Sequence, residues 1–508
     1  MDNPINKLKQ RRWAMQLALT TGLALLFLAA LLWGLRGVTP ARAALGTRYV
    51  NGATGSDDSD CGNPADPCDT IGYALTQAGN GDTILVAAGT YTETLDVGGN
   101  PLTLRGGYVM SGTLWLPRSG ETIVDADGAD SPVFNFDPDN NVTVEGFTIQ
   151  GANHTSGEGG GFFINASTLI ISDTVVQDNT AGTCGGGVYA EEVSGAATVS
   201  LINSKLLNNE AGEGGGLCGS GLITLDNVTV QGNAAQGWGG GMYASRVTIT
   251  DSQIVSNTAV DRGGGVFANV AYIYNSEISD NEVTGVGTSY GGGIDVSVGG
   301  TGHLVIRDST VSDNRIVGTE SIGGGIAAEG AKATIVNTIV SNNSAQIRGG
   351  VGVYQTMLTV TNSLFISNTG DGLGGRYITG TIVNATFADN TGNGLFVGGA
   401  VSITNSIMWG NEEGNYYCNG GCTLTCSDVE DEEITGTGNI FADPLFVDAA
   451  NGDYRLGVGS PCIDKGTPSG APAEDIEGTS RDAAPDMGAY EWTGFRIFLP
   501  LALKNVGP

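Results

Sequence analysis

The sequence predicts an all-β solenoid, a parallel β-helix, from three observations. One pattern recurs about ten times between Val142 and Asn411: an alternating apolar run, an Asn or Asp with a small polar residue, a closing Asn and a glycine cluster. The apolar residues in each copy alternate, as in RVTITDSQIVSNTAVDRGGGVFAN at 246–269, and show no 3.6-residue period. Repeats of this length are typical of units that stack because a single unit cannot bury its own apolar face.

The closing Asn of each copy sets the repeat length. Successive spacings are 30, 24, 24, 24, 33, 29, 25, 22 and 21 residues, and the copy that begins at Val142 has no such Asn, so we expect eleven coils. Three short strands and their turns fill each repeat, with coils about 4.8 Å apart. We expect the Asn side chains to stack and to exchange amide hydrogen bonds along the axis. The predicted ladder consists of Asn179, Asn209, Asn233, Asn257, Asn281, Asn314, Asn343, Asn368, Asn390 and Asn411.

Glycine clusters, such as 239–241 and 263–265, allow positive φ and close approach between coils. The paired motifs N-S-x-φ-x-x-N and G-G-G-φ resemble repeats of the polymorphic outer-membrane protein family and, more broadly, right-handed parallel β-helix proteins of the pectate-lyase-like superfamily. The resemblance covers roughly 270 residues. It implies a right-handed helix, and it leaves the activity open because that superfamily includes lyases, hydrolases, epimerases and adhesins.

The N-terminus resembles an export signal at residues 1–43, with basic residues before an apolar run at 13–35 and small residues at 41–43. The run is also long enough to span a bilayer, so an uncleaved anchor is the alternative. We therefore predict a secreted or cell-surface protein. It would contact a membrane only through this signal or through a C-terminal tail at 493–508.

The remaining chain divides into three parts. Residues 44–130 are expected to form an N-terminal cap and the first coils, residues 131–411 the repeats, and residues 412–492 a C-terminal cap. A short capping helix is predicted after Thr70, because Ile71, Ala74, Leu75 and Ala78 follow helical spacing.

The C-terminal part, residues 439–491, contains NIFADPLFVD and DMGAYE and resembles the choice-of-anchor Q segment. Four of its charged residues could be mistaken for an active site: Asp475, Arg481, Asp486 and Glu491. We expect them instead to hold turns together through salt bridges and bonds to the backbone.

Charge narrows the class of partner. The chain has 22 Lys and Arg residues against 53 Asp and Glu residues, a net charge of −31. This balance argues against binding nucleic acid or anionic lipid by charge, and it is compatible with cations and neutral glycans. We expect a monomer that contacts a polysaccharide or surface glycan. No cofactor is evident, and calcium is the one ion that we keep as an expectation.

Eight cysteines in an exported chain favour disulfides over metal sites. Cys61 and Cys68 are predicted to pair. Cys184 and Cys218 lie on adjacent coils but four positions out of register, so their pairing stays open. So does the connectivity of Cys418, Cys422, Cys426 and Cys462.

Catalytic motifs are sparse. The two histidines, His154 and His303, lie outside the G-H-G and D-P-H-D motifs that the resemblance would supply. Lys332, Arg307 and Arg315 are interpreted as isolated, with no Asp cluster at matching coil positions. The sequence therefore favours a protein without a catalytic site. A polysaccharide lyase, or another carbohydrate-active enzyme of the same superfamily, is the alternative.

One column favours a binding role. The second residue after each glycine cluster should point outward, because the first and third are apolar and should point inward. Together with the residue before each cluster, this column presents aromatic and charged groups suited to sugar rings. We predict a glycan-binding set of Phe163, Tyr189, Trp238, Tyr243, Arg262, Phe267 and Tyr290. Alternatively, the rings only stabilise the sheet, by about 0.2–1 kcal/mol per pair. The functional prediction is a cell-surface protein for adhesion or glycan contact.

Overall fold

The computed structural model describes residues 46–494, apart from residues 59, 118–119, 137–140, 166–167, 192–196 and 432–434. The predicted export signal and nearly all of the predicted tail lie outside these residues. No helix within the described ranges is both long and apolar enough to cross a membrane.

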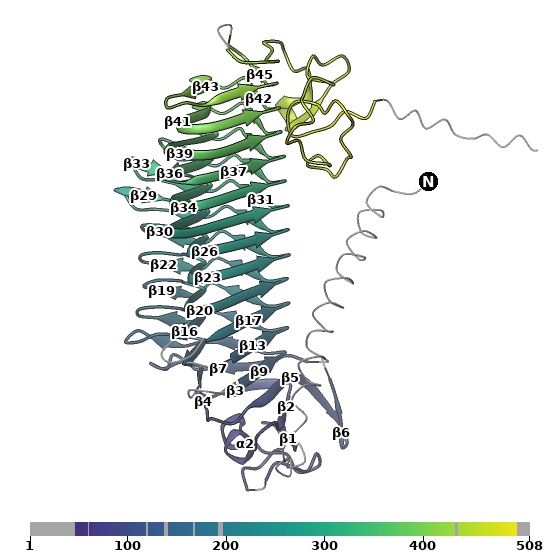
Figure 1. Ribbon diagram of the computed structural model, residues 1–508. Helices are drawn as coiled ribbons and strands as arrows, with labels where there is room; N and C mark the ends of the chain where they lie inside the picture. The colour runs from purple at the N-terminus through teal and green to yellow at the C-terminus, as the bar shows by residue number, and fades with distance from the viewer. Residues whose placement is uncertain are drawn as a thin grey trace, which may run out of the picture. The chain divides into compact units, whose positions relative to one another are not determined.

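The described chain is a right-handed parallel β-helix of about 13 turns, which confirms the predicted fold class (Figure 1). Within the described residues, its second sheet has 14 strands. Three of them lie outside the expected repeats: β3 (Gly89–Thr92), β7 (Thr122–Asp125) and β45 (Asp428–Val429). The other eleven fall within the repeat region, one for each coil that the sequence predicted.

Three parallel sheets form the walls of the solenoid. The first sheet contains β1 (Thr47–Val50), β2 (Thr83–Ala87), β4 (Leu95–Val97), β5 (Leu102–Ser111), β6 (Leu114–Leu116), β8 (Phe134–Phe136), β9 (Asn141–Glu145), β12 (Phe162–Asn165), β13 (Thr168–Ser172), β16 (Val188–Glu191), β17 (Thr198–Ile202), β20 (Leu217–Asp226), β23 (Met242–Thr250), β26 (Val266–Tyr274), β30 (Ile294–Arg307), β34 (Ile326–Val336), β36 (Val351–Tyr354), β37 (Met357–Thr361), β39 (Leu373–Val383), β41 (Asn393–Thr404), β43 (Gly414–Cys418) and β44 (Thr423–Thr425). The hairpin strand β6 is antiparallel to β5.

The second sheet also contains β10 (Thr148–Gln150), β14 (Val175–Gln177), β18 (Lys205–Leu207), β21 (Thr229–Gln231), β24 (Gln253–Val255), β27 (Glu277–Ser279), β31 (Thr310–Ser312), β35 (Ile339–Ser341), β38 (Leu364–Ile366), β40 (Thr386–Ala388) and β42 (Ile407–Trp409). The third sheet contains β11 (Asn153–His154), β15 (Thr180–Ala181), β19 (Glu210–Ala211), β22 (Ala234–Ala235), β25 (Thr258–Ala259), β28 (Glu282–Val283) and β32 (Arg315–Ile316). Two short pairs complete the strands: β29 (Thr288–Tyr290) with β33 (Glu320–Ile322), and β46 (Phe446–Asp448) with β47 (Asp453–Leu456).

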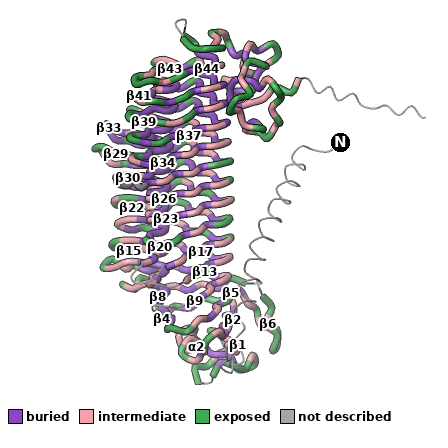
Figure 2. Tube along the Cα trace, viewed as in Figure 1, coloured by how far each residue is buried: buried purple, intermediate pink, exposed green. Residues whose placement is uncertain are grey.

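The apolar core runs along the inside of the coils (Figure 2). Val247, Ile249 and Ile254 alternate with polar residues along β23 and β24, and all three are fully buried. Burial of a side chain of this size contributes roughly 1.5–3 kcal/mol. Because equivalent residues of successive coils are in register, each coil covers the apolar edge of the one before it.

The Asn ladder runs through one buried corner. The Oδ1 atom of Asn257 accepts from the backbone N–H and from Nδ2 of Asn233, both at 3.0 Å. Nδ2 of Asn233 also donates to the carbonyl of Leu206 at 3.0 Å. The ladder extends one step beyond the predicted set, because Asn411 donates to Oδ1 of Asn415 at 2.8 Å. The side chains therefore satisfy backbone groups that the turn would otherwise leave buried and unpaired.

A second ladder uses the small polar residue of the repeat. The backbone N–H of Ser252 donates to Oγ of Ser276 at 3.1 Å, and both residues are buried. The residue before each step adopts positive φ, with values of 50° at Asp251 and 48° at Asn275. Asn and Asp tolerate this left-handed region better than other side chains do. This explains why an Asn or Asp precedes the small polar residue in the repeat.

The glycine clusters have two roles, illustrated by 239–241. Gly239 has a φ of +68°, which a residue with a Cβ adopts at a penalty. A Cβ on Gly240 would lie 2.4 Å from the carbonyl oxygen of Gly264 in the next coil. The turn therefore requires glycine both for its conformation and for the approach of neighbouring coils.

The N-terminal end is covered by helix α2 (Ile71–Gln77), in agreement with the predicted cap. The side chain of Thr70 accepts from the N–H of Tyr73, as expected for the N-cap. Glu93 also binds this terminus, because its carboxylate accepts from the N–H groups of Ile71 and Gly72 at 2.9 and 2.8 Å. Ile71 and Ala74 are buried in the solenoid core.

The C-terminal segment, residues 440–492, packs against the outer surface of the second sheet (Figure 1). Tyr454 and Ala489 contact Leu364 and Ala388 in one apolar cluster. Three outer corner residues of successive coils donate to backbone carbonyls of the segment: Asn362 to Glu474, Asn384 to Asp486 and Asn405 to Thr467. A short 3-10 helix, η1 (Ala449–Asn451), lies between β46 and β47. The segment is therefore held by hydrogen bonds to three successive coils.

Candidate functional site

Each glycine turn presents one residue before the cluster and one after it on the outer surface. Backbone pairing places these residues in two columns, with one member of each column on each of six successive coils. The edge column, before the clusters, consists of Glu158, Cys184, Glu213, Trp238, Arg262 and Tyr290. The face column, after the clusters, consists of Phe163, Tyr189, Cys218, Tyr243, Phe267 and Asp295.

Three rings from both columns form an aromatic stack. The centroid of Phe267 lies 5.4 Å from that of Tyr243, with 17° between the planes, and 5.2 Å from that of Trp238. Trp238 and Tyr243 are 6.1 Å apart. The expectation that Phe267 is an exposed platform is wrong, because only 5% of it is accessible between its neighbours. The accessible ring surface of the stack belongs to Trp238 and Tyr243.

A disulfide separates this stack from a second ring pair. Phe163 and Tyr189 have centroids 5.5 Å apart and lie on two neighbouring coils closer to the N-terminus. On the coil between them and Tyr243, the face column holds Cys218, which is bonded to Cys184 with a Cα–Cα distance of 5.6 Å. The pairing left open by the sequence is therefore formed, and it links neighbouring coils across the glycine turn.

The remaining six cysteines form two disulfides and leave two thiols. Cys61 is bonded to Cys68, as predicted, and Cys418 is bonded to Cys422. Cys426 and Cys462 are thiols. Sγ of Cys462 donates to the Asp428 carboxylate at 3.0 Å, and burial raises the pKa of this thiol.

The Glu213 groove, with a volume of about 540 Å³, lies beside the disulfide. It is lined by Glu158, Thr183, Cys184, Tyr189, Gly212, Glu213, Gln236 and Gly237. Partial burial raises the pKa of Glu213, and burial followed by the nearby Glu191 raises that of Glu158. Burial and the two neighbouring glutamates raise the pKa of Tyr189 to about 12. The groove therefore combines an aromatic wall with two half-buried carboxylates.

The Arg262 groove is larger, about 990 Å³, and lies on the other side of the stack. Arg262 is held in place from two directions. Its guanidinium carbon lies 4.3 Å from the centroid of the Tyr290 ring, and its Nη1 lies 3.6 Å from Oδ2 of the fully buried Asp295. Ser297 donates to the other carboxylate oxygen of Asp295. Burial raises the pKa of Asp295 to about 6 against the opposing effects of Ser297 and Arg262.

The floor of the Arg262 groove is completed by His303, Glu329, Lys332 and the exposed Tyr377. Lys332 pairs in register with His303, and burial together with Lys332 lowers the pKa of that imidazole. The interpretation of Lys332 as isolated is therefore wrong.

The sequence missed this grouping because an insertion at residues 298–301 in β30 hides the register. Arg315, also interpreted as isolated, forms an ion pair with Glu282.

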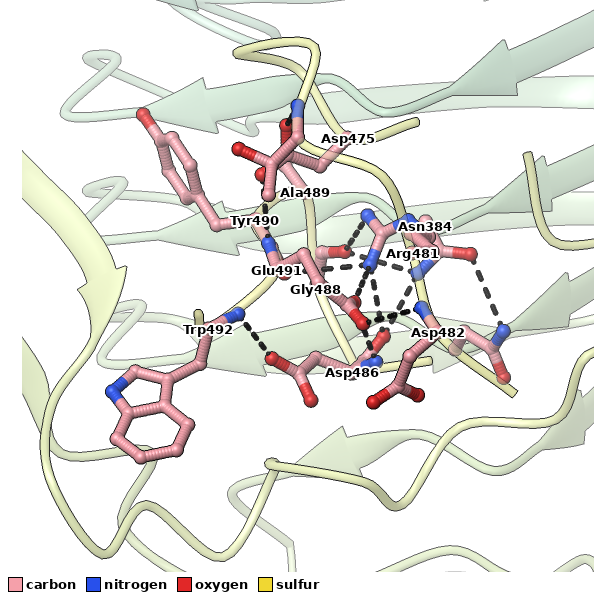
Figure 3. Close-up of polar contacts among 12 residues, drawn as sticks. Asn384, Asp475, Arg481, Asp482, Asp486, Gly488, Ala489, Tyr490, Glu491 and Trp492 are labelled. Atoms are coloured by element: carbon pink, nitrogen blue, oxygen red, sulfur yellow. Dashed lines mark hydrogen bonds and ion pairs between the residues drawn. The ribbon is translucent and has the colours of Figure 1, made fainter. Parts of the chain in front are cut away.

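The charged residues of the C-terminal segment are committed to turns (Figure 3). Arg481 and Glu491 form a buried ion pair, with Nη1 and Oε2 2.9 Å apart and side-chain exposures of 2% and 4%. The Asp475 carboxylate accepts from the N–H groups of Thr479 and Glu491 at 2.7 and 2.8 Å. Asp486 accepts from the N–H of Asp464 at 2.7 Å. These four side chains therefore act as structural groups.

No group of three or more His, Cys, Asp or Glu side chains in the described ranges is arranged to hold a metal ion. Calcium binding stays a prediction.

Comparison with known proteins assigns no family to this chain. No family model matches this chain. It is 30% identical over 138 residues to the uncharacterized protein YwoF of Bacillus subtilis (strain 168), a match that covers 26% of this chain and 27% of YwoF. The match thus spans about a quarter of that relative.

The solved structures similar to this chain align with low TM-scores. The periplasmic alginate epimerase AlgG aligns with 67% of this chain and 77% of its own, at 11% identity and a TM-score of 0.34. Pectate lyase Pel9A aligns with 89% of this chain and 97% of its own, at 15% identity and a TM-score of 0.28. The GH136 lacto-N-biosidase of Eubacterium ramulus aligns with 75% of this chain and 68% of its own, at 11% identity and a TM-score of 0.30. All three belong to the class of the alternative expectation, carbohydrate-active enzymes, rather than to adhesins. At scores below 0.5 they carry no activity over to this chain, and the fold rests on the strand register.

Proposed function

We propose that the outer surface of the first sheet binds an extended polysaccharide. The aromatic stack carries this proposal, because Trp238 and Tyr243 present ring surface between two grooves with hydrogen-bonding side chains. Rings held on a rigid sheet lose little conformational freedom on binding, and sugar rings present the apolar C–H faces that such rings cover. The coil spacing of about 4.8 Å would let a linear polymer contact several coils at once.

Export and surface location belong to the same proposal. Three disulfides in the described residues support an oxidising compartment. Mass spectrometry of the secreted protein should find a mature N-terminus near Ala44. An intact N-terminus in the membrane fraction would instead support the anchor alternative.

Binding is tested by retention of the protein in gels that contain polysaccharides. Replacing both Trp238 and Tyr243 by Ala should weaken retention at least about tenfold, since the contact of one aromatic face is worth roughly 1.5 kcal/mol. Tyr417→Ala is a matched control, because Tyr417 occupies the equivalent position on a later coil and is 45% exposed. It lies seven coils from Tyr243, roughly 34 Å away. Equal retention of the double variant on every polymer that binds the wild type would refute the proposal.

A second candidate function, chemistry on the bound polysaccharide, is favoured by the Arg262 groove. A His303 imidazole with a lowered pKa can accept a proton at neutral pH, and Arg262 and Lys332 can stabilise developing negative charge. Incubation with a panel of polysaccharides would distinguish the reactions. Unsaturated ends would indicate a lyase, new reducing ends without unsaturation a hydrolase, and retention without product a binding protein. Activity that survives in both His303→Ala and Lys332→Met would exclude this groove.

A further inference from the structure

Two grooves of different charge flank the aromatic stack. Glu158 and Glu213 line one groove, and Arg262 and Lys332 line the other together with the exposed Glu329. The stack between them includes Trp238, which occupies the same edge column as Glu213 and Arg262. A polymer that crosses the stack would therefore meet two carboxylates on one side, and two cations beside one carboxylate on the other.

Glu213 lacks a cationic partner among the described residues, whereas Glu158 has the His154 imidazole and the Tyr189 hydroxyl nearby. No salt bridge within the described part of the chain involves Glu158 or Glu213, although both are half-buried. A partly buried carboxylate without a cation retains a desolvation penalty that an incoming cation would offset. The two residues are two coils apart, roughly 10 Å along the axis, so one small ion cannot readily contact both. This spacing favours a positively charged group on an extended ligand, and the Tyr189 ring provides a surface for it.

Contacts within the protein orient the guanidinium of Arg262 but leave its N–H groups available to a ligand. It stacks on the Tyr290 ring, and its Nη1 lies 3.6 Å from Oδ2 of Asp295. Among the described residues, its N–H groups form no hydrogen bond. Oδ2 of Asp295 is buried without a hydrogen-bond donor, so the Arg262 charge balances this carboxylate while its N–H groups remain available. A planar guanidinium with free N–H groups suits a carboxylate or sulfate oxygen pair. The exposed Lys332 adds a second positive charge to the same groove.

The order within the edge column is the decisive observation. Glu213, Trp238 and Arg262 lie on consecutive coils, so a carboxylate, an indole and a guanidinium follow one another at about 4.8 Å intervals. We propose that this surface recognises a zwitterionic polysaccharide, one that carries both free amino groups and acidic groups. The amine would bind in the Glu213 groove, a sugar ring on Trp238, and the acid on Arg262 and Lys332. This inference rests on the proposed polysaccharide binding and specifies its ligand.

The overall charge of the protein supports the same ligand class. With a net charge of −31, the chain repels a purely anionic polymer outside the Arg262 groove. A purely cationic polymer would be attracted generally but repelled by Arg262 and Lys332. A neutral polymer would leave both charged grooves without ionic partners. Only a polymer with both charges can match both grooves, and like-charge contacts would discriminate against the others.

The test compares four probes of related backbone: carboxymethyl chitosan, chitosan oligosaccharide, carboxymethyl cellulose and unmodified cello-oligosaccharide. We expect the wild type to bind carboxymethyl chitosan up to about fivefold more tightly than each probe with a single kind of charge, as for one partly exposed ion pair. Glu213→Gln should abolish the preference over carboxymethyl cellulose, and Lys332→Gln should abolish the preference over chitosan. Both side chains are at least partly exposed, so these variants should fold.

The matched controls are Glu412→Gln and Lys205→Gln, which remove exposed charges of the same sign away from both grooves. Neither should change the order of the four probes. Equal affinity for carboxymethyl chitosan and carboxymethyl cellulose, or preferences that survive in Glu213→Gln and Lys332→Gln, would overturn the inference and leave polysaccharide binding in place. Failure of the wild type to bind any polymer would overturn both.

Discussion

Removing one rung of the Asn ladder should destabilise the solenoid measurably. In Asn257→Ala, four hydrogen bonds are lost. Oδ1 of Asn257 accepts from the backbone N–H and Nδ2 of Asn233, both at 3.0 Å. Its Nδ2 donates to the carbonyl of Val230 at 2.9 Å and to Oδ1 of Asn281 at 3.0 Å. Asn257 is fully buried, so water cannot replace these partners without opening the corner.

The expected loss follows from the orphaned groups. A buried N–H left without an acceptor costs about 1–3 kcal/mol, and each other lost bond about 0.5–1.5 kcal/mol. Several partners keep a second bond, for example the Asn233 amide to Leu206, so we expect a total near 4 kcal/mol rather than the full sum. For a cooperative unit of roughly 450 residues, the unfolding entropy near 60 °C is about 0.9 kcal/mol/K, and Tm should fall by about 4 °C.

Two measurements check this prediction. Calorimetry gives the shift in Tm, with Gln253→Ala as the control, because Gln253 is exposed on the same coil and its side chain donates to the side chain of Glu277, another residue of the outer surface. Hydrogen exchange should show lost protection at the amide of Asn233, whose acceptor has been removed. A Tm equal to that of the control, together with wild-type exchange at Asn233, would show that the ladder does not stabilise the corner.

Two further predictions concern buried charge. Arg481→Met should destabilise the C-terminal segment by about 3–5 kcal/mol, since it leaves the buried Glu491 carboxylate unpaired; limited proteolysis should then release this segment while the coils stay resistant. Burial raises the pKa of Asp295 and Asp486 to about 6, so between the ordinary value of 3.8 and about 6 the folded protein binds more protons than the unfolded chain. The stability of the wild type should therefore rise as the pH falls from 7 to 5. Over that range the urea midpoint of Asp295→Asn should rise less than that of the wild type. Urea midpoints that change equally with pH in the two proteins would contradict the raised pKa of Asp295.

The coil architecture could be predicted because it depends on local periodicity. A side-chain period of two separates inward from outward residues, and a closing Asn in nearly every repeat marks the same corner. Inward residues such as Val247 and Ile249 and the corner residue Asn257 are accordingly buried. These features need only the spacing along the chain.

The site depends on geometry that spacing does not contain. Phe267 is outward by periodicity but is covered by Trp238, which comes from the other side of the glycine turn. The Cys184–Cys218 bond likewise crosses that turn, whose shape is set by the positive φ of Gly185 and Gly214. The Arg262 groove was missed for a different reason, because the register shift between Ser297 and Gly302 brings side chains together that sequence counting keeps apart.

The fold also explains why ligand-binding groups would gather beside the glycine turns. Inward positions are restricted to apolar side chains by packing, the corners to Asn, Asp, Ser or Thr by positive φ and the two ladders, and the clusters to glycine by contact between coils. The edge column is under none of these restrictions, and it changes from carboxylate to indole to guanidinium on consecutive coils at Glu213, Trp238 and Arg262. Contacts between neighbouring coils explain part of this order, since Arg262 stacks on Tyr290 and Trp238 packs on Phe267, but these contacts do not involve Glu213. The alternation is therefore better explained by recognition of a ligand whose own groups alternate.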